Sequence, residues 1–251
     1  MVMLLLLALC ARPAPLLPSQ LAYGTHPGAW VLIQRVTFKS MEALRQAPSK
    51  FVLVSQFVQG SDPNSYTYAM IQSDQEPLEV LILSRYAQKP AYKQQLPSPP
   101  FSEFRKELLA QGPPFAEESW NEVLGYYEDV SRTAEASNAV GANGIWCLAV
   151  SLTFASEEQA RMAIEAIGPL EKHVRDNEPH TLGYSIMQSD SYPHKVMVLE
   201  RYTDKEDAYL KVHRTSKPFL AFKEVLSGMD PVIDGHSYYD APELSSLASS
   251  R

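Results

Sequence analysis

The chain has 251 residues, of which 45% are hydrophobic and 20% are charged, and its formal net charge is −7. This composition is that of a globular protein, and the acidic balance without any basic run argues against nucleic acid as a partner. The length suits two units of about 100 residues each plus tails. Cys10 and Cys147 are the only cysteines, so no disulfide framework is expected.

The first 26 residues form a separate segment. The apolar run from Val2 to Leu9 is shorter than the about 20 residues that a membrane-spanning helix needs, so stable membrane insertion is not expected. Its length and the small residues after it fit a cleavable secretory signal, although no basic residue precedes it. The alternatives are a secreted protein, or a degenerate leader or gene-start artefact on a cytoplasmic one.

An internal duplication organises the rest of the chain. A shift of about 116 positions aligns Gln72-Ser73-Asp74 with Gln188-Ser189-Asp190, and Arg85-Tyr86 with Arg201-Tyr202. Two copies of this kind indicate a paired domain and not a long repeat array. We therefore divide the chain into a leader (1–26), a first repeat (27–130), a linker (131–143), a second repeat (144–242) and a polar tail (243–251).

The first copy begins with a predicted strand from Trp30 to Phe38, and Ser40 starts a helix. Pro48 interrupts that helix, and the segment from Phe51 to Val58 is rich enough in β-branched and aromatic residues to suggest a strand. The spacing of the duplication favours a helix there. We follow the duplication and predict helix.

The second copy is easier to interpret. Alternating apolar residues predict a strand over 144–154, and the capping-box pattern from Ser156 to Gln159 starts a helix with apolar residues at helical spacing up to Val174. Two strands follow over 180–188 and 195–202, joined by a polar turn. Short helices over 203–214 and 216–226, the latter with Ser216 as N-cap, precede a last strand over 232–239.

This order of strand, helix, two strands, helix and strand is the ferredoxin-like plan, so the predicted fold class is α+β. A four-stranded sheet with helices on one face leaves its other face apolar. Pairing the two copies sheet to sheet buries both apolar faces, and the linker makes that association intramolecular. The tandem form therefore suggests a self-contained monomer, and further dimerisation of the whole chain is the alternative.

A family resemblance supports this arrangement. The segment Glu200-Arg-Tyr202, the polar stretch ending at His213, and Ser216-Lys-Pro-Phe219-Leu-Ala-Phe222 resemble the signature of the antibiotic biosynthesis monooxygenase (ABM) family. The resemblance is close in the second copy and looser in the first. It implies ferredoxin-like units paired as a dimeric α+β barrel, here made within one chain.

The resemblance also implies a chemistry. Enzymes of the family include oxygenases that use neither metal nor flavin and act with O2 on electron-rich anthrones, quinols or phenols. Such a site needs an apolar pocket, one base near neutrality and donors for an oxyanion. We therefore expect a cofactor-independent monooxygenase of secondary metabolism or detoxification, with a small aromatic molecule and O2 as its partners.

Two residues are the catalytic candidates. His213 stands at the family's histidine position, and imidazole is the side chain whose ordinary pKa suits a base at neutral pH. Arg201 can orient a phenolate, as can Arg85 in the first copy. The alternatives are a surface helix histidine and strand arginines, one of them beside Glu200, that are engaged in salt bridges.

The substrate-binding candidates are aromatic residues at equivalent places of both copies, with Arg85. All of the aromatics can equally be core residues, since alternating strands bury such side chains in any case. Asp74 and Asp190 follow Gln-Ser at a strand end and are interpreted as turn-capping residues. The aromatic candidates are Trp146, Tyr184, Tyr202, Tyr209, Phe219, Phe222, Trp30 and Tyr68.

The two copies are not equivalent, because the first has Gln95 or Leu96 where the second has His213. We therefore place the site in the second lobe. The main alternative is a non-catalytic ligand-binding or stress-associated barrel of the same fold. Haem degradation is disfavoured, because the family's axial histidine is absent near Phe222. Scattered histidines and the lack of a glycine-rich phosphate loop predict no metal, flavin or nucleotide.

Overall fold

The computed structural model describes residues 28–61, 63–112, 115–128, 132, 140 and 144–240. The expected leader, nearly all of the linker and the polar tail lie outside the described residues. In the described part, both copies follow the predicted order of strand, helix, two strands, helical segment and strand. None of the described helices combines the length and apolar character needed to span a membrane.

The first lobe comprises β1 (Trp30–Thr37), α1 (Met41–Ser61), β2 (Ser65–Ser73), β3 (Glu79–Tyr86), α2 (Lys89–Gln95), α3 (Pro99–Ala110) and β4 (Phe115–Tyr126). The second lobe comprises β5 (Ile145–Thr153), α5 (Glu157–Asn177), β6 (Thr181–Ser189), β7 (Lys195–Tyr202), η1 (Lys205–Val212), η2 (His213–Thr215), α6 (Lys217–Met229) and β8 (Val232–Asp240).

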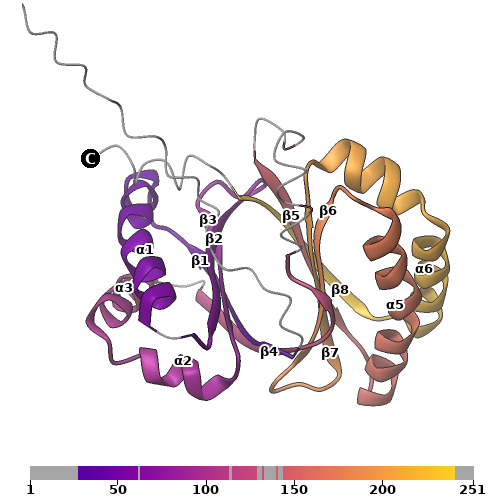
Figure 1. Ribbon diagram of the computed structural model, residues 1–251, viewed down its shortest axis with the longest axis horizontal. Coiled ribbons are helices and arrows are strands. Elements are labelled where there is room, and N and C mark those ends of the chain that lie inside the picture. Colours follow the sequence, from indigo (N-terminus) through magenta and orange to yellow (C-terminus); the bar gives the residue numbers. More distant parts are fainter. Residues whose placement is uncertain are drawn as a thin grey trace, which may run out of the picture.

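The eight strands form one closed barrel in the order β1-β3-β2-β8-β5-β7-β6-β4, and every pairing is antiparallel. The predicted α+β barrel of two ferredoxin-like units is confirmed. The two sheets also join at their edges, because the last strand of each lobe pairs with the second strand of the other, β4 with β6 and β8 with β2. In Figure 1 helices α1 to α3 cover one side of the barrel, and α5 and α6 cover the opposite side.

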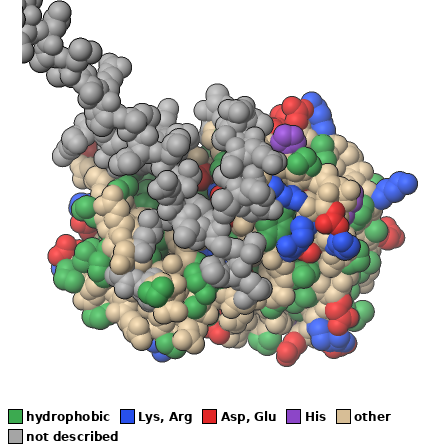
Figure 2. Space-filling view, viewed as in Figure 1, with side chains coloured by type: hydrophobic (Ala, Val, Ile, Leu, Met, Phe, Trp, Pro, Cys, Tyr) green, Lys and Arg blue, Asp and Glu red, His purple; other side chains and the backbone are tan. Residues whose placement is uncertain are grey.

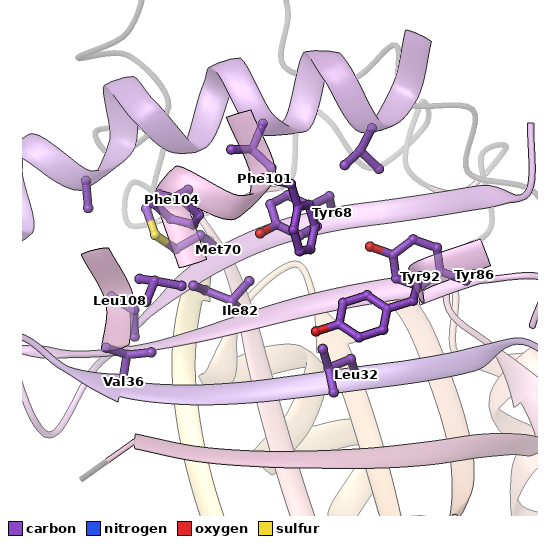
Figure 3. Packing of buried hydrophobic residues seen from close by; sticks show 14 of the residues in the cluster. Leu32, Val36, Tyr68, Met70, Ile82, Tyr86, Tyr92, Phe101, Phe104 and Leu108 are labelled. Atoms are coloured by element: carbon purple, nitrogen blue, oxygen red, sulfur yellow. The ribbon is translucent and has the colours of Figure 1, made fainter. Parts of the chain in front are cut away.

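Strand alternation divides the buried residues into separate layers. On β3, Ile82 packs in the cluster beneath the first-lobe helices, whereas its neighbour Leu83 packs in the barrel interior. Figure 3 shows the first-lobe layer, with Tyr68, Tyr92 and Phe101 between strands and helices. The side of the sheet on which a residue lies therefore decides whether it belongs to the barrel interior or to a helix-covered core.

The disputed segment of the first copy is helical. α1 continues through Pro48 to Ser61, and Leu44, Val54 and Val58 are buried on its inner face at helical spacing. The prediction taken from the duplication is confirmed. Burial of this apolar stripe outweighs the strand propensity of the segment and the cost of an internal proline.

The two predicted N-caps of the second lobe are also confirmed. The Ser156 hydroxyl accepts a hydrogen bond from the Gln159 backbone N–H at 3.2 Å, and the Gln159 side chain accepts from the Ala155 backbone N–H. The Ser216 hydroxyl accepts from the Phe219 backbone N–H at 3.3 Å. These bonds satisfy helix N–H groups that have no partner within the helix.

Two reciprocal contacts join the lobes. The Trp30 indole N–H donates to Asp190 Oδ2 at 3.4 Å, and the Trp146 indole N–H donates to Asp74 Oδ2 at 3.2 Å. Each aspartate therefore binds a tryptophan of the other copy. The interpretation of Asp74 and Asp190 as turn-capping residues is wrong in its details.

The turns are capped by the preceding serines instead. Ser73 Oγ accepts from two backbone N–H groups of its turn, and Ser189 Oγ accepts from the Ser191 and Tyr192 N–H groups. The aspartate side chains are consequently free to cross to the other lobe.

In the space-filling view of Figure 2, acidic and basic side chains are interspersed over the helical side of the second lobe. This face does not present a field of a single sign, which is the usual means of steering a charged partner.

Gly183 tests how tightly the backbone of β6 packs against the segment that follows β4. A Cβ atom at this β6 position would lie 2.0 Å from the backbone oxygen of Tyr127. We expect Gly183→Ala to lower the free energy of unfolding by about 2–3 kcal/mol, because the contacted atom belongs to backbone and cannot move aside. Denaturant unfolding followed by circular dichroism measures the change.

Gly228→Ala in α6 is the matched control, because a Cβ atom there meets nothing within 4 Å. It should leave stability unchanged or raise it by up to about 1 kcal/mol. Equal stability of the two variants would show that β4 and β6 can separate at no cost.

Candidate active site of the second lobe

The site begins with an unusual helical turn after β7. η1 is a π-helix whose N-cap, Asp204, accepts a hydrogen bond from the Asp207 backbone N–H at 2.6 Å, and η2 is a single 3₁₀ turn that starts at His213. The corresponding first-lobe element, α2, is an ordinary α-helix. π-helical turns accommodate an extra residue and are frequent at functional sites.

The extra residues can be located by comparing the two copies. Lys89 and Lys205 each lie over the tryptophan of their own lobe, yet the next aromatic residue comes three positions later in the first copy, at Tyr92, and four later in the second, at Tyr209. The wider turn of η1 absorbs this insertion. A second inserted residue lies between Tyr209 and α6, so the place of His213 corresponds to that of Gln95.

His213 is fully buried, with 0% of its surface exposed. Its Nδ1 lies 2.9 Å from Oε2 of Glu178, which is itself buried and also accepts a hydrogen bond from the Thr181 hydroxyl at 3.1 Å. Nε2 of His213 has no hydrogen-bond partner among the described residues. The imidazole is thus oriented through one nitrogen, and the other nitrogen is available for chemistry.

Four aromatic rings surround His213. Tyr209 stacks on the imidazole, with 6.0 Å between the ring centroids and 17° between the planes. Phe219 meets it edge-on at 5.1 Å. Tyr184 and Tyr202 lie at centroid distances of 5.5 and 5.7 Å. The shell is aromatic, and three of its four rings carry a phenolic hydroxyl group.

A second buried carboxyl group, that of Glu200, completes the cluster. The Tyr202 hydroxyl donates to Glu200 Oε2 at 2.7 Å. Burial raises the pKa of Glu200, against the charge of His213 and the Tyr202 hydrogen bond. Burial by itself lowers the pKa of His213, but the hydrogen bond that its Nδ1–H donates to Glu178 and the charges of Glu200 and Glu178 outweigh it and raise that pKa above its ordinary value.

The cluster therefore has the parts of an acid–base site: a histidine with one free nitrogen, a carboxylate that orients it and nearby hydroxyl donors. Within the part of the chain that the structure describes, no group of three or more His, Cys, Asp or Glu side chains is placed to hold a metal ion.

The structure separates Arg201 from His213. Glu200 and Tyr202 face the helices, so Arg201 between them points into the barrel, where it lies 3.4 Å from Glu128 and 3.7 Å from Asp240. The prediction that Arg201 orients a substrate beside His213 is corrected, because alternate strand residues lie on opposite faces. The alternative, that Arg201 is engaged in a salt bridge, is confirmed, and its partners are Glu128 and Asp240.

Arg85 of the first lobe likewise points into the barrel interior and forms an ion pair there. Its guanidinium makes two hydrogen bonds of 2.7 Å to the Glu122 carboxylate. Arg85 and Arg201 lie on the Tyr127 ring, at 4.7 and 4.9 Å from its centroid. Both arginines are thus parts of the barrel interior, and the predicted role of Arg85 in substrate binding has no support from its position.

The aromatic candidates fall into two sets. Tyr184, Tyr202, Tyr209 and Phe219 meet at His213, and Trp146 lies next to them, 4.8 Å from Tyr209. Phe222 is buried in the helix-covered core of the same lobe.

Trp30 and Tyr68 belong to the separate first-lobe core. At the places of His213 and Glu200 the first lobe has the uncharged side chains Gln95 and Ser84. Gln95 donates a hydrogen bond to the Ser65 hydroxyl at 2.5 Å. The sheet and barrel interior separate these residues from His213, as Figure 1 shows for the two helical layers. The first lobe does not contribute them to the His213 cluster.

Sequence reasoning missed Glu178. It lies 35 positions before His213, at the junction of α5 and β6, so no local spacing links the two residues. The available signal was the duplication itself, because Asp62 is the aligned residue of the first copy and is also acidic.

The first lobe has a cavity of its own, of about 340 Å³. One wall is apolar, and charged side chains of α2 and β4 form the rim. The turn that follows β6 closes it from the second lobe. The lining residues are Trp30, Leu32, Lys89, Tyr92, Lys93, Leu96, Glu117, Glu118, Ser119, Ser189, Ser191 and Tyr192.

Comparison with known proteins agrees with the second-lobe motif. Residues 147–225 match the profile of the antibiotic biosynthesis monooxygenase family. The resemblance predicted from the segment ending at Phe222 is therefore confirmed, and it supports a monooxygenase-like function. A comparison with curated proteins finds no match.

Solved structures share the whole two-lobed fold. A candidate monooxygenase from Fusobacterium nucleatum superposes with a TM-score of 0.69 at 13% identity, covering 85% of this chain and 93% of that chain. One from Lactobacillus acidophilus NCFM gives 0.67 at 11% identity, covering 85% and 95%. An anthrone oxidase-like protein gives 0.56 at 8%, covering 84% and 90%. At these identities the likeness shows the fold.

The His213–Glu178 pair predicts a specific pH dependence of stability. Because the folded state raises the pKa of His213, its contribution is fully present below the ordinary value of about 6.5 and is lost as pH rises through the raised pKa. Relative to His213→Gln, the wild-type chain should lose stability as the solution becomes alkaline. Urea unfolding at a series of pH values measures both slopes.

His194→Gln serves as the control, because His194 lies in the turn before β7 and contacts Tyr192 instead of the buried cluster. Its slope should follow that of the wild-type chain. Parallel slopes for His213→Gln and the wild-type chain would contradict the ion pair.

Proposed function

We propose that the second lobe, whose residues 147–225 match the profile of the antibiotic biosynthesis monooxygenase family, is a cofactor-independent oxygenase for a small electron-rich aromatic compound. An anthrone, quinol or phenol is the expected substrate class, and O2 is the oxidant. The observation that carries the proposal is the buried imidazole of His213, held by Glu178 at Nδ1 and without a hydrogen-bond partner at Nε2 in the part of the chain that the structure describes.

The proposed reaction begins with proton transfer. His213 Nε2 takes a proton from the activated C–H or O–H group of the substrate, and Glu178 stabilises the imidazolium that forms. The resulting carbanion or phenolate is a reductant that O2 can oxidise. Tyr184 and Tyr202 belong to the same shell. Because the Tyr202 hydroxyl donates to Glu200, the Tyr184 hydroxyl is the candidate to stabilise the oxyanion.

For an anthrone-type CH2 group the steps balance without a further reductant. Carbon bonds to one oxygen atom, and the peroxide takes up the proton from His213. Loss of the second carbon-bound proton then breaks the O–O bond. The CH2 group and O2 become a ketone and water. His213 ends in its starting state.

Substrate must reach a residue with 0% exposed surface. Tyr209 is the only partly buried side chain among the three tyrosines of the shell, and it lies on η1. We propose that η1 moves outward to admit the aromatic ring, which then replaces the stacking of Tyr209 on the imidazole. A π-helical turn suits this role because its hydrogen-bond geometry is less regular than that of an α-helix.

The second candidate is a binding barrel without catalysis. The cavity of about 340 Å³ lies in the first lobe, which lacks the histidine and has Gln95 in its place. Its size is within the range of small-molecule sites, and Trp30 and Tyr92 provide flat apolar surface. In this reading the first lobe holds the ligand and the second lobe supports the barrel.

Oxygen uptake separates the two candidates. With anthrones, naphthols and quinols and no added cofactor, we expect uptake by the purified protein and a loss of about 10²–10⁴-fold in kcat for His213→Gln, because the base is removed. The rate should rise with pH through the raised pKa of His213. Glu178→Gln should move that rise to lower pH, because it removes the hydrogen bond that raises the pKa.

Gln95→Ala is the first-lobe control and should retain turnover. Normal turnover by His213→Gln together with its loss in Gln95→Ala would transfer the site to the first lobe.

Ligand binding tests the second candidate. Leu96→Trp should fill part of the first-lobe cavity, because Leu96 lines it, and should weaken binding of a naphthol measured by calorimetry. His213→Gln should leave that binding intact. If His213→Gln abolishes binding and Leu96→Trp has no effect, the ligand binds in the second lobe and the binding-barrel candidate is wrong.

A further inference from the structure

A buried base must exchange its proton with water by some path. His213 has 0% of its surface exposed and is enclosed by aromatic rings. Proton transfer over such a distance requires a chain of titratable or hydroxyl groups with short gaps between them.

Glu178 connects His213 to a second histidine. Its Oε2 lies 2.9 Å from Nδ1 of His213, and its Oε1 lies 3.7 Å from Nε2 of His173. Oε1 is buried and has no hydrogen-bond partner among the described residues. The 3.7 Å gap is longer than a hydrogen bond, and a small rotation of either side chain would close it.

In this row of three side chains, His213, Glu178 and His173, the last lies at the protein surface. It is on the last turns of α5, and 31% of its side chain is exposed, whereas only 2% of the Glu178 side chain is exposed. Asn177 Nδ2 lies 3.3 Å from the second ring nitrogen of His173 and donates to the His173 carbonyl at 3.2 Å. The ring is thereby held with one nitrogen toward Glu178.

Neighbouring charges on α5 are engaged elsewhere. Lys172 pairs with Asp176 at 2.6 Å, and Arg175 pairs with Glu171. Among the described residues neither cation pairs with Glu178, and His173 is the titratable group of α5 that approaches its Oε1 atom.

The duplication gives independent support. The residue aligned with His173 in the first copy is Phe57, and the residue at the place of His213 is Gln95. Phe57 packs against the first-lobe core. The first lobe therefore lacks both histidines of the row, and the two occur together in the second lobe.

We propose that His173 is the solvent-side end of a proton path that reaches His213 through Glu178. The path itself is a property of the folded protein, and only its use during turnover rests on the proposed oxygenase function.

The transfer balances without any other reactant. Once Nε2 of His213 has gained a proton from the substrate, the imidazolium passes its Nδ1 proton to Glu178, so that the Nδ1–H bond breaks and an O–H bond forms at Oε2. The carboxyl group turns about its Cγ–Cδ bond and passes this proton to Nε2 of His173 in the tautomer that carries its proton on Nδ1. In that tautomer the hydrogen bond from Asn177 to Nδ1 is released, and the Nδ1–H bond breaks as its proton goes to water. The reverse steps restore the Nδ1–H bond when His213 gives its Nε2 proton to the peroxide.

Nuclear magnetic resonance of the protein without substrate tests the path directly. With ¹⁵N-labelled histidine, the Nδ1–H proton of His213 gives a resolved signal, and its exchange with water can be measured. We expect His173→Gln to slow this exchange about tenfold or more, because the glutamine amide keeps the size of the side chain and cannot relay a proton.

His236→Gln is the matched control, since His236 lies on β8 and bonds to Asp234. It should exchange at the wild-type rate, and superposable backbone spectra should show that both variants fold. Equal exchange in His173→Gln and the wild-type chain would overturn the proposal.

The turnover rate provides a second, independent measurement. If the chain consumes O2, His173→Gln should lower kcat at low buffer concentration, and added imidazole should restore it. Slow exchange in His173→Gln without turnover by any variant would support the path and contradict the oxygenase proposal. A kcat loss that imidazole does not restore would overturn the role of the path in turnover.

Discussion

Closure of the barrel is the constraint on which the rest of the structure depends. Each four-stranded sheet is covered by helices on one face only, so its other face needs the second lobe. The pairing of β4 with β6 and of β8 with β2 turns two sheets into one continuous surface, and the reciprocal contacts of Trp30 with Asp190 and Trp146 with Asp74 fasten it. Each helix-covered core lies within or almost within one lobe, whereas the barrel interior is built by both lobes together.

The closed barrel also determines where a reactive site can form, in the barrel interior or on the outer face of the sheet under the helices. Its interior contains ion pairs such as Arg85 with Glu122 and is filled with apolar side chains, so it is a packed core. The reactive groups lie on the outer face of the sheet, under the helices. Glu200 and Arg201 are neighbours in the chain, yet strand alternation assigns the first to the site and the second to the barrel interior.

Two inserted residues account for much of the difference between the lobes. In the first lobe α2 is an α-helix, and Gln95 bonds to Ser65 in a neutral cluster. In the second lobe the chain widens into a π-helix, and His213 meets the buried Glu178. A pair of copies with one scaffold can therefore differ in chemistry, because helix geometry after β7 selects which side chain enters the core.

The sequence by itself determined the duplication, the element order, the α+β barrel and the position of His213 in the second copy, because repeat spacing, alternation and caps are local patterns. It even resolved α1, where the alignment with α5 outweighed local propensity. Only the tertiary structure decided the partners. Glu178 joins His213 across 35 positions, and Arg201 turns away from both. The physical reason is that such contacts depend on which face of a strand a residue occupies and on how the helices pack over the sheet, and chain spacing records neither.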